Sequence, residues 1–142
     1  MSTFEEHNSR LKHKKDLLYY LKQNEKHEVY SDWYVTMSFY AAVECIEAMF
    51  CEVKPVIKGR MGEVTVVEHC RNHKERNATL RHCYGDLFPT YTTLYGQNRI
   101  AKYRCYVPVP NNGQNAESLL SGIENECNRL IKEAESKKRS VA

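Results

Sequence analysis

The sequence predicts an all-α protein, an up-and-down bundle of about five helices. Three observations carry this prediction. The chain of 142 residues is close to the usual size of one domain. It contains only 6 Gly and 4 Pro, too few for a turn-rich β-sandwich. Its larger apolar residues recur at helical spacing over long segments. We therefore expect residues 1–142 to form a single helical domain.

The first two predicted helices differ in how much of their surface is apolar. Residues 5–23 carry one leucine stripe among many basic side chains, which predicts a helix on the outside of the bundle. Residues 33–50 are apolar on nearly every face and contain no Gly or Pro, which predicts the central helix. Ser31 or Asp32 is expected to cap the start of this helix.

A loop and a third helix are expected next. Pro55 and two glycines break the helical pattern over residues 54–66, where the run Val-Thr-Val-Val favours a short extended piece. The third helix is expected over residues 67–87 and should end near Gly85 or Pro89, because both residue types oppose continuation of a helix.

Two further helices complete the predicted bundle. A fourth is expected over residues 90–106, and the Pro-Val-Pro-Asn-Asn-Gly run after it marks a break. A fifth is expected over residues 116–135, where leucines and isoleucines stand at helical spacing. Residues 137–142 are expected to fray into a basic tail.

The composition of the chain indicates the cellular compartment in which the protein is expected to work. The sequence has no run of roughly 20 apolar residues that would span a bilayer, and its first ten residues are polar without a signal-peptide core. We therefore expect a cytoplasmic protein without a membrane partner.

Its six cysteines form no Cys-x-x-Cys pair, so buried reduced thiols are expected rather than disulfides or a structural zinc. A net charge of +3 is too small to identify a nucleic-acid binder by itself.

One group of residues has the chemistry needed for metal-independent RNA cleavage. Arg76 and Asn77 precede His82 and Tyr84 in a segment rich in histidine and arginine. A histidine can move the proton of a 2′-hydroxyl, and a fixed arginine can stabilise charge on the phosphate. On an ideal helix, Arg76 and His82 point about 120° apart, so a shared site requires a wide groove or a bend. The alternative is that both make ordinary surface or capping contacts.

Two histidines suggest a weaker alternative, a metal site. His69 and His73 stand one helical turn apart, a spacing that can present two imidazoles to one ion. The motif supplies no evident third ligand, so two solvent-facing histidines are the simpler interpretation, and no metal or other cofactor is expected.

Aromatic and basic residues alternate in the fourth predicted helix. This pattern suits stacking of nucleobases and contact with phosphates. The alternative is a bundle seam in which tyrosine rings are buried and their hydroxyls reach the rim. The residues concerned are Tyr91, Tyr95, Arg99, Lys102, Tyr103, Arg104 and Tyr106.

The central helix carries two carboxylates on an otherwise apolar surface, Glu44 and Glu47. A buried carboxylate is costly without a charged or hydrogen-bonded partner. Arg76 or Arg99 is therefore the expected partner of a buried glutamate in this helix.

Residues 31–106 contain a tryptophan-initiated helix with a Phe-Tyr-Ala-Ala core, a His-x-x-Arg helix, and a Tyr-x-x-Leu pattern followed by a basic Arg-x-x-x-Tyr helix. The positions concerned are Trp33, Phe39, Tyr40, Ala41, Ala42, Ala48, His73, Arg76, Tyr91, Leu94, Arg99 and Tyr103. In this combination the segment resembles a bacterial branch of the HEPN superfamily.

The resemblance implies a helical bundle, frequently a homodimer, in a superfamily rich in endoribonucleases of toxin-antitoxin and defence systems. It implies Arg76, Asn77, His82 and Tyr84 as the catalytic set of such a nuclease. It also implies RNA as a partner, with an antitoxin or other protein as a further one. The alternative is a non-catalytic module that binds RNA, a nucleotide or a partner protein. A third interpretation is a purely structural bundle. The predicted RNA- or phosphate-binding residues are His73, Arg99, Lys102, Tyr103 and Arg104.

Overall fold

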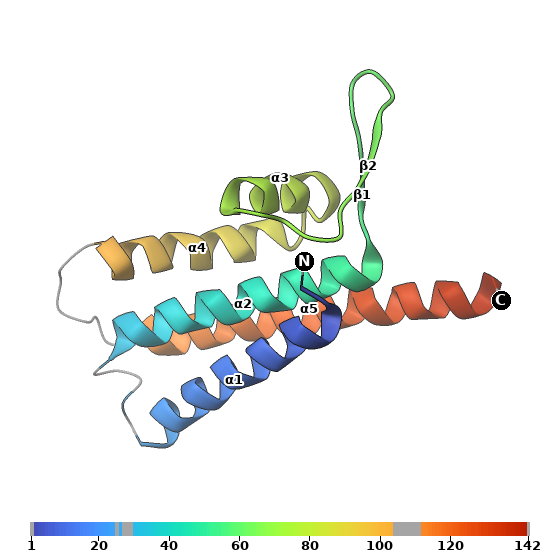
Figure 1. Ribbon diagram of the computed structural model, residues 1–142. Coiled ribbons are helices and arrows are strands. Elements are labelled where there is room, and N and C mark those ends of the chain that lie inside the picture. The colour runs from blue at the N-terminus through green and yellow to red at the C-terminus, as the bar shows by residue number, and fades with distance from the viewer. Residues whose placement is uncertain (1, 25, 27–29, 104–111, 142) are drawn as a thin grey trace.

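The computed structural model describes residues 2–24, 26, 30–103 and 112–141 (Figure 1). These residues form a helical bundle with a small antiparallel hairpin, so the predicted all-α class is confirmed. The elements are α1 (Phe4–Gln23), α2 (Ser31–Val53), β1 (Val56–Lys58), β2 (Val64–Val66), α3 (His73–Cys83), α4 (Phe88–Tyr103) and α5 (Asn112–Val141). The four long helices alternate in direction, with α1 and α4 running opposite to α2 and α5 (Figure 1).

Helix α2 is the central element, as its all-round apolar surface predicts. It packs against α1, α4 and α5, and its large side chains Phe39, Ile46, Met49 and Phe50 are fully buried. The start of this helix differs from the prediction, because Ser31 already lies inside it and the capping position offers no side-chain hydrogen bond. Burial of the apolar side chains therefore defines α2 more than its cap does.

Helix α2 also meets the length and composition of a membrane-spanning segment, which the sequence was expected to lack. Its mean hydropathy over the most apolar window is 1.2. Within the protein, 67% of that window is buried. A core helix of a bundle, which neighbouring helices cover, has this same property.

Helix α1 covers one side of α2. A capping box starts it, in which Thr3 accepts from the Glu6 amide and the Glu6 carboxylate accepts from the Thr3 amide. Leu18 is buried on the inner face of the helix. Two exposed ion pairs, Lys15 with Glu124 and Lys22 with Glu117, join α1 to α5.

Strands β1 and β2 form a hairpin that projects away from the helices (Figure 1). Val56 pairs with Val66 in antiparallel register. Gly62, in the turn, has a φ of 82°, which glycine adopts without steric cost. The extended piece predicted for the Val-Thr-Val-Val run is therefore present as β2, together with a partner strand, β1.

Helix α3 begins later than predicted. Asn72 caps it, because its side chain accepts from the Glu75 amide at 2.9 Å. His69 and Cys70 consequently lie in the segment between β2 and α3. His69 and His73 are thus not one turn apart on a helix, the arrangement that the alternative metal site required.

The last two helices also differ from the predicted bounds. Pro89 lies in the first turn of α4, where its missing amide hydrogen is tolerated. Helix α5 continues to Val141, so the predicted fraying is wrong for residues 137–141, and Ala142 lies outside the described residues. Ion pairs of Glu133 with Arg129 and Lys137 support these last turns.

Five described cysteines are free, and three of them, Cys45, Cys70 and Cys127, are buried. Burial raises the pKa of the Cys127 thiol to about 12 and that of Cys70 to about 11. These three thiols therefore act as small apolar side chains, as the sequence predicts for them. Cys105 lies outside the described residues.

Candidate functional site

An open pocket of about 400 Å³ lies where helices α2, α3 and α4 meet. Polar and aromatic side chains from all three helices line it: Tyr40, His73, Tyr95, Asn98, Arg99 and Lys102. Three of these, His73, Arg99 and Lys102, are residues for which the sequence predicts contact with RNA or phosphate. The structure brings these three together. The side chain of Tyr103, and Arg104 and Tyr106, lie outside what the structure describes.

The sequence spacing of α4 explains how its side chains reach the pocket. Tyr95, Asn98, Arg99 and Lys102 stand at positions i, i+3, i+4 and i+7, which share one face of a helix. Tyr91 lies one turn before Tyr95 on the same side of α4, but it is fully buried and its ring stacks against that of Tyr95. Each of the two predicted interpretations therefore fits one tyrosine. Tyr91 lies in the buried seam, and Tyr95 lines the pocket.

Two cations and two aromatic rings occupy the pocket wall. The Lys102 ammonium donates to the Tyr40 hydroxyl at 2.9 Å. Arg99 is exposed at the rim. The ring of Tyr95 lies tilted against that of His73, with centroids 5.3 Å apart. Cations beside half-buried aromatic rings provide contacts for both a phosphate and a base.

His73 contributes a hydrogen-bond donor. Its Nδ1 lies 2.9 Å from Nη1 of Arg76. Because a guanidinium can only donate, Nδ1 accepts, and the proton of the neutral ring is on Nε2. Burial, the Arg76 guanidinium and the Lys102 ammonium together hold the pKa of His73 below its usual value. His73 is therefore a neutral N–H donor near pH 7.

Asn98 supplies a further polar group. Its side chain is 5% exposed, and its Oδ1 has no hydrogen-bond partner among the residues that the structure describes. Buried amide oxygens are rarely left without a donor. A ligand with an amino group, such as a nucleobase, would satisfy this oxygen.

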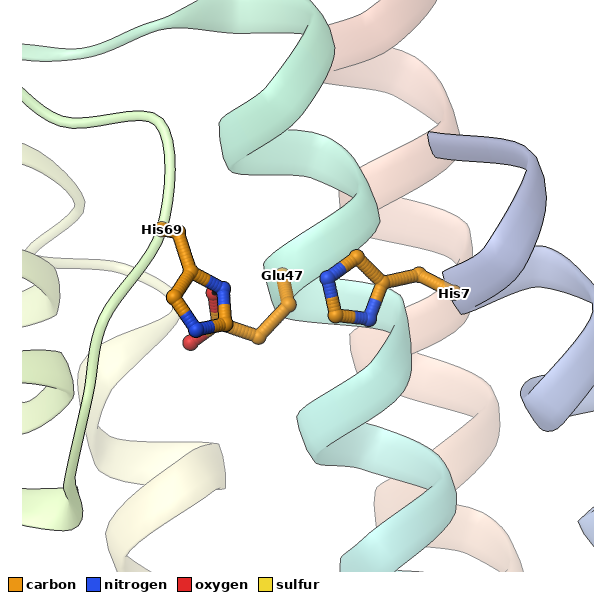
Figure 2. Close-up of side chains that lie close together, drawn as sticks. All are labelled: His7, Glu47 and His69. Atoms are coloured by element: carbon orange, nitrogen blue, oxygen red, sulfur yellow. Dashed lines mark ion pairs between the residues drawn. The ribbon is translucent and has the colours of Figure 1, made fainter. Parts of the chain in front are cut away.

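Behind the pocket, Glu47 lies at the centre of a buried polar cluster. His7 from α1 and His69 from the segment after β2 approach Glu47 of α2 from opposite sides (Figure 2). His7 is 3% exposed and Glu47 is 2% exposed. His7 was not predicted from the sequence, although it shares the inner stripe of α1 with Leu11 and Leu18, and that spacing was a signal for it.

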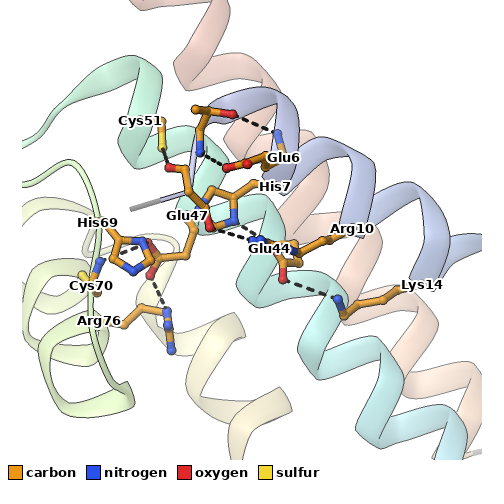
Figure 3. Close-up of polar contacts among 12 residues, drawn as sticks. Glu6, His7, Arg10, Lys14, Glu44, Glu47, Cys51, His69, Cys70 and Arg76 are labelled. Atoms are coloured by element: carbon orange, nitrogen blue, oxygen red, sulfur yellow. Dashed lines mark hydrogen bonds and ion pairs between the residues drawn. The ribbon is translucent and has the colours of Figure 1, made fainter.

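Each oxygen of Glu47 has a protein donor (Figure 3). Oε1 accepts from Nε of Arg76 at 2.9 Å, and Oε2 accepts from the Cys70 amide at 3.1 Å. The predicted pairing of a buried glutamate with Arg76 is confirmed. Burial disfavours the charge of Arg76, but Tyr91 and Glu47 outweigh it and hold the pKa of Arg76 above its ordinary value. The other carboxylate, Glu44, pairs with His7 at 2.7 Å and Lys14 at 3.4 Å.

The four predicted catalytic residues do not meet within one chain. Arg76 points inward to Glu47, whereas His82 is exposed and has no hydrogen bond to any described residue. His82 stands nine positions after His73, about 180° around an ideal helix. Tyr84 stacks on Phe50, and burial raises the pKa of its phenol. A cleft shared by Arg76 and His82 would therefore need a second copy of the chain.

Asn77 lies on the partly buried side of α3. Its Oδ1 is buried without a hydrogen-bond partner among the described residues. Asn77 is not among the residues that line the pocket. Its predicted role beside a scissile phosphate stays a prediction.

No family model matches the sequence, and no curated protein or solved structure matches it either. The resemblance to HEPN domains therefore stays a prediction that rests on the residues named for it.

Proposed function

We propose that this chain is a cytoplasmic HEPN-like module that binds single-stranded RNA in the pocket between α2, α3 and α4. The observation that carries the proposal is the convergence of Arg99, Lys102 and His73 beside the rings of Tyr40 and Tyr95. Two cations suit the phosphate backbone, and half-buried aromatic rings suit unstacked bases. A homodimer and an antitoxin partner, which the resemblance implies, stay predictions.

The pocket chemistry supports binding more than cleavage. Neutral His73 presents a protonated Nε2, and its other nitrogen accepts from Arg76, so it has no free lone pair with which to act as a base. Arg76 is held by Glu47 and is 6% exposed. His82 lies on the opposite side of α3 from His73. Binding needs none of these groups to move.

Each group in the pocket has a distinct role in the proposed complex. Arg99 and Lys102 contact phosphate oxygens, with Arg99 able to form two parallel hydrogen bonds. Tyr95 provides the stacking surface for a base, and Asn98 accepts from an exocyclic amino group of that base. Tyr40 positions Lys102 through the hydrogen bond to its hydroxyl.

The proposal is tested by fluorescence anisotropy with labelled single-stranded RNA of mixed sequence. The Arg99→Gln/Lys102→Gln variant removes two positive charges from the pocket. Its matched control is Lys132→Gln/Lys138→Gln, which removes two charges from exposed positions on α5. We expect the pocket variant to lower affinity and to reduce the slope of log affinity against log salt by about 1.4, because each phosphate contact with a single strand contributes about 0.7. The control should leave the slope near that of the wild type.

Equal losses in the two double variants would contradict a specific pocket and indicate general charge attraction. The same RNA is also incubated with wild type and His82→Ala in EDTA. Intact RNA is expected with both proteins. Cleavage by the wild type that His82→Ala abolishes would instead support the endoribonuclease that the resemblance implies and overturn a binding-only function.

A further inference from the structure

We propose that His7, Glu47 and His69 form a binding site for one divalent transition-metal ion, with Zn²⁺ as the best fit. The three residues come from α1, α2 and the segment between β2 and α3 (Figure 2). One ligand atom from each lies within 4.8 Å of the other two. This inference does not depend on RNA binding.

The side chain of His7 is prepared for a metal. Its Nδ1 lies 2.7 Å from Oε2 of Glu44, and because a carboxylate accepts, Nδ1 carries the proton. In the neutral ring, Nε2 then has a lone pair. Nε2 is buried and has no hydrogen-bond partner among the described residues. A carboxylate that orients the second nitrogen of a ligating histidine is a usual feature of zinc sites.

His69 supplies the second nitrogen. Its Nδ1 lies 3.2 Å from Oε2 of Glu47 but makes no hydrogen bond with any described residue, because the two groups are not aligned for one. Two ligands of a tetrahedral zinc, each about 2.0–2.1 Å from the ion, are about 3.4 Å apart. The separation of His69 from Glu47 thus already fits a shared ion.

The two imidazole rings also lie near each other. The ring centroids of His7 and His69 are 5.8 Å apart, with 22° between the ring planes. Arg76 engages Oε1 of Glu47, which leaves Oε2 for the ion (Figure 3). The Cys70 amide also donates to Oε2, so this oxygen would act as a bridging acceptor. Two histidines and one glutamate form a ligand set that zinc accepts, with a fourth position for water.

A bound ion would connect three segments that are far apart in the sequence. It would hold α1 and the segment before α3 against α2, so binding should stabilise the fold. The test uses the full chain with Zn²⁺ followed by thermal denaturation, and with Co²⁺ followed by visible absorption. We expect Zn²⁺ to raise Tm in a way that EDTA reverses. We also expect one equivalent of Co²⁺ to give the spectrum of a four-coordinate ion.

Variants distinguish this site from adventitious binding. His69→Gln should abolish the Co²⁺ spectrum, because it removes a ligand at a partly exposed position. Glu44→Gln should weaken metal affinity by about 10–100-fold, the usual effect of losing a group that orients a ligand. His13→Gln, at an exposed position of the same helix as His7, and Cys51→Ser, one turn after Glu47, should bind as the wild type does.

Three results would overturn the proposal. These are no Tm shift and no Co²⁺ spectrum in the wild type, an unchanged spectrum in folded His69→Gln, or loss of the spectrum in Cys51→Ser. Should His69→Gln fail to fold by circular dichroism, proton NMR of the Co²⁺-loaded wild type decides. Strongly shifted ring protons from two histidines support the site, and shifted cysteine protons or no shifted histidine protons contradict it.

Discussion

At the scale of single residues, Glu47 determines how α2 meets α3. Both of its oxygens accept hydrogen bonds from residues after the hairpin, one from Arg76 and one from the Cys70 amide. Glu47 and the Arg76 side chain are 2% and 7% exposed. A charge buried to this degree is tolerated only while its partner is present.

Removal of Arg76 should therefore strongly destabilise the protein. We expect Arg76→Met to lower the free energy of unfolding by about 3–5 kcal/mol, because it leaves Glu47 charged and unpaired in the interior. Urea denaturation measures this loss. In Glu47→Leu/Arg76→Met the loss should be clearly smaller than the sum of the two single losses. Additive losses would show that the pair is not coupled.

His73 should make stability depend on pH. Its pKa is lower in the folded protein than in the unfolded chain, because of burial and the nearby Arg76 and Lys102 charges. Below about pH 6.5 the unfolded chain then binds more protons than the folded one, so the unfolding free energy decreases on acidification. Above that pH, the unfolding free energy keeps its full value.

The pH effect is measured as the difference between wild type and His73→Gln in urea denaturation from pH 7.5 to 5.5. We expect the wild type to lose more stability than the variant over this range. The comparison removes the contributions of other histidines, since both proteins contain them. Parallel pH profiles would contradict the assigned role of His73.

The pairing of side chains could be predicted from the sequence where a charged residue lies in a buried helix and needs a partner. A buried glutamate in a mostly apolar helix requires a partner, and Arg76 was one of the two arginines predicted for that reason. His7 was not predicted, because its partners come from α2 and from the segment after β2, and only the fold brings them together. The divergence of Arg76 and His82 follows from helical geometry, but the inward direction of Arg76 depends on Glu47.

At the scale of elements, apolar residues at helical spacing predicted that the helices exist. The short polar segments between them did not show where each helix begins or ends. Residues 67–87 were predicted as one helix, although Asn72 caps α3 and residues 67–72 are not helical. Pro89 was expected to oppose a helix, but in the first turn of α4 it removes no needed hydrogen bond. In α5, ion pairs between i and i+4 support the helix beyond Ile131, the last large apolar residue of its predicted stripe.

The packing of α5 in the bundle should depend on its buried apolar side chains more than on its ion pairs with α1. Ile123 of α5 is fully buried, whereas Lys22 and Glu117 are both partly exposed. We expect Ile123→Ala to lower the unfolding free energy by about 2–5 kcal/mol. Lys22→Ala should lower it by less than about 1 kcal/mol, because solvent screens the pair. Urea denaturation of both variants checks this, and a larger loss for Lys22→Ala would contradict it.

At the scale of the whole molecule, one face of α2 organises the polar groups of the bundle. Tyr40, Glu44 and Glu47 stand at positions i, i+4 and i+7 of that helix. Tyr40 lines the pocket that we propose binds RNA, and Glu44 and Glu47 lie beside His7 and His69. Arg76 connects the two regions, since it contacts both His73 and Glu47. The apolar faces of the other helices pack around these polar side chains.

The most direct test of the proposed function is to locate bound RNA on the protein. Single-stranded RNA that contains 4-thiouridine is irradiated with the wild-type chain, and the crosslinked peptides are identified by mass spectrometry. We expect crosslinks at Tyr40 or Tyr95, which disappear in Arg99→Gln/Lys102→Gln. Crosslinks confined to other surfaces, or equally abundant in that variant, would contradict binding in this pocket.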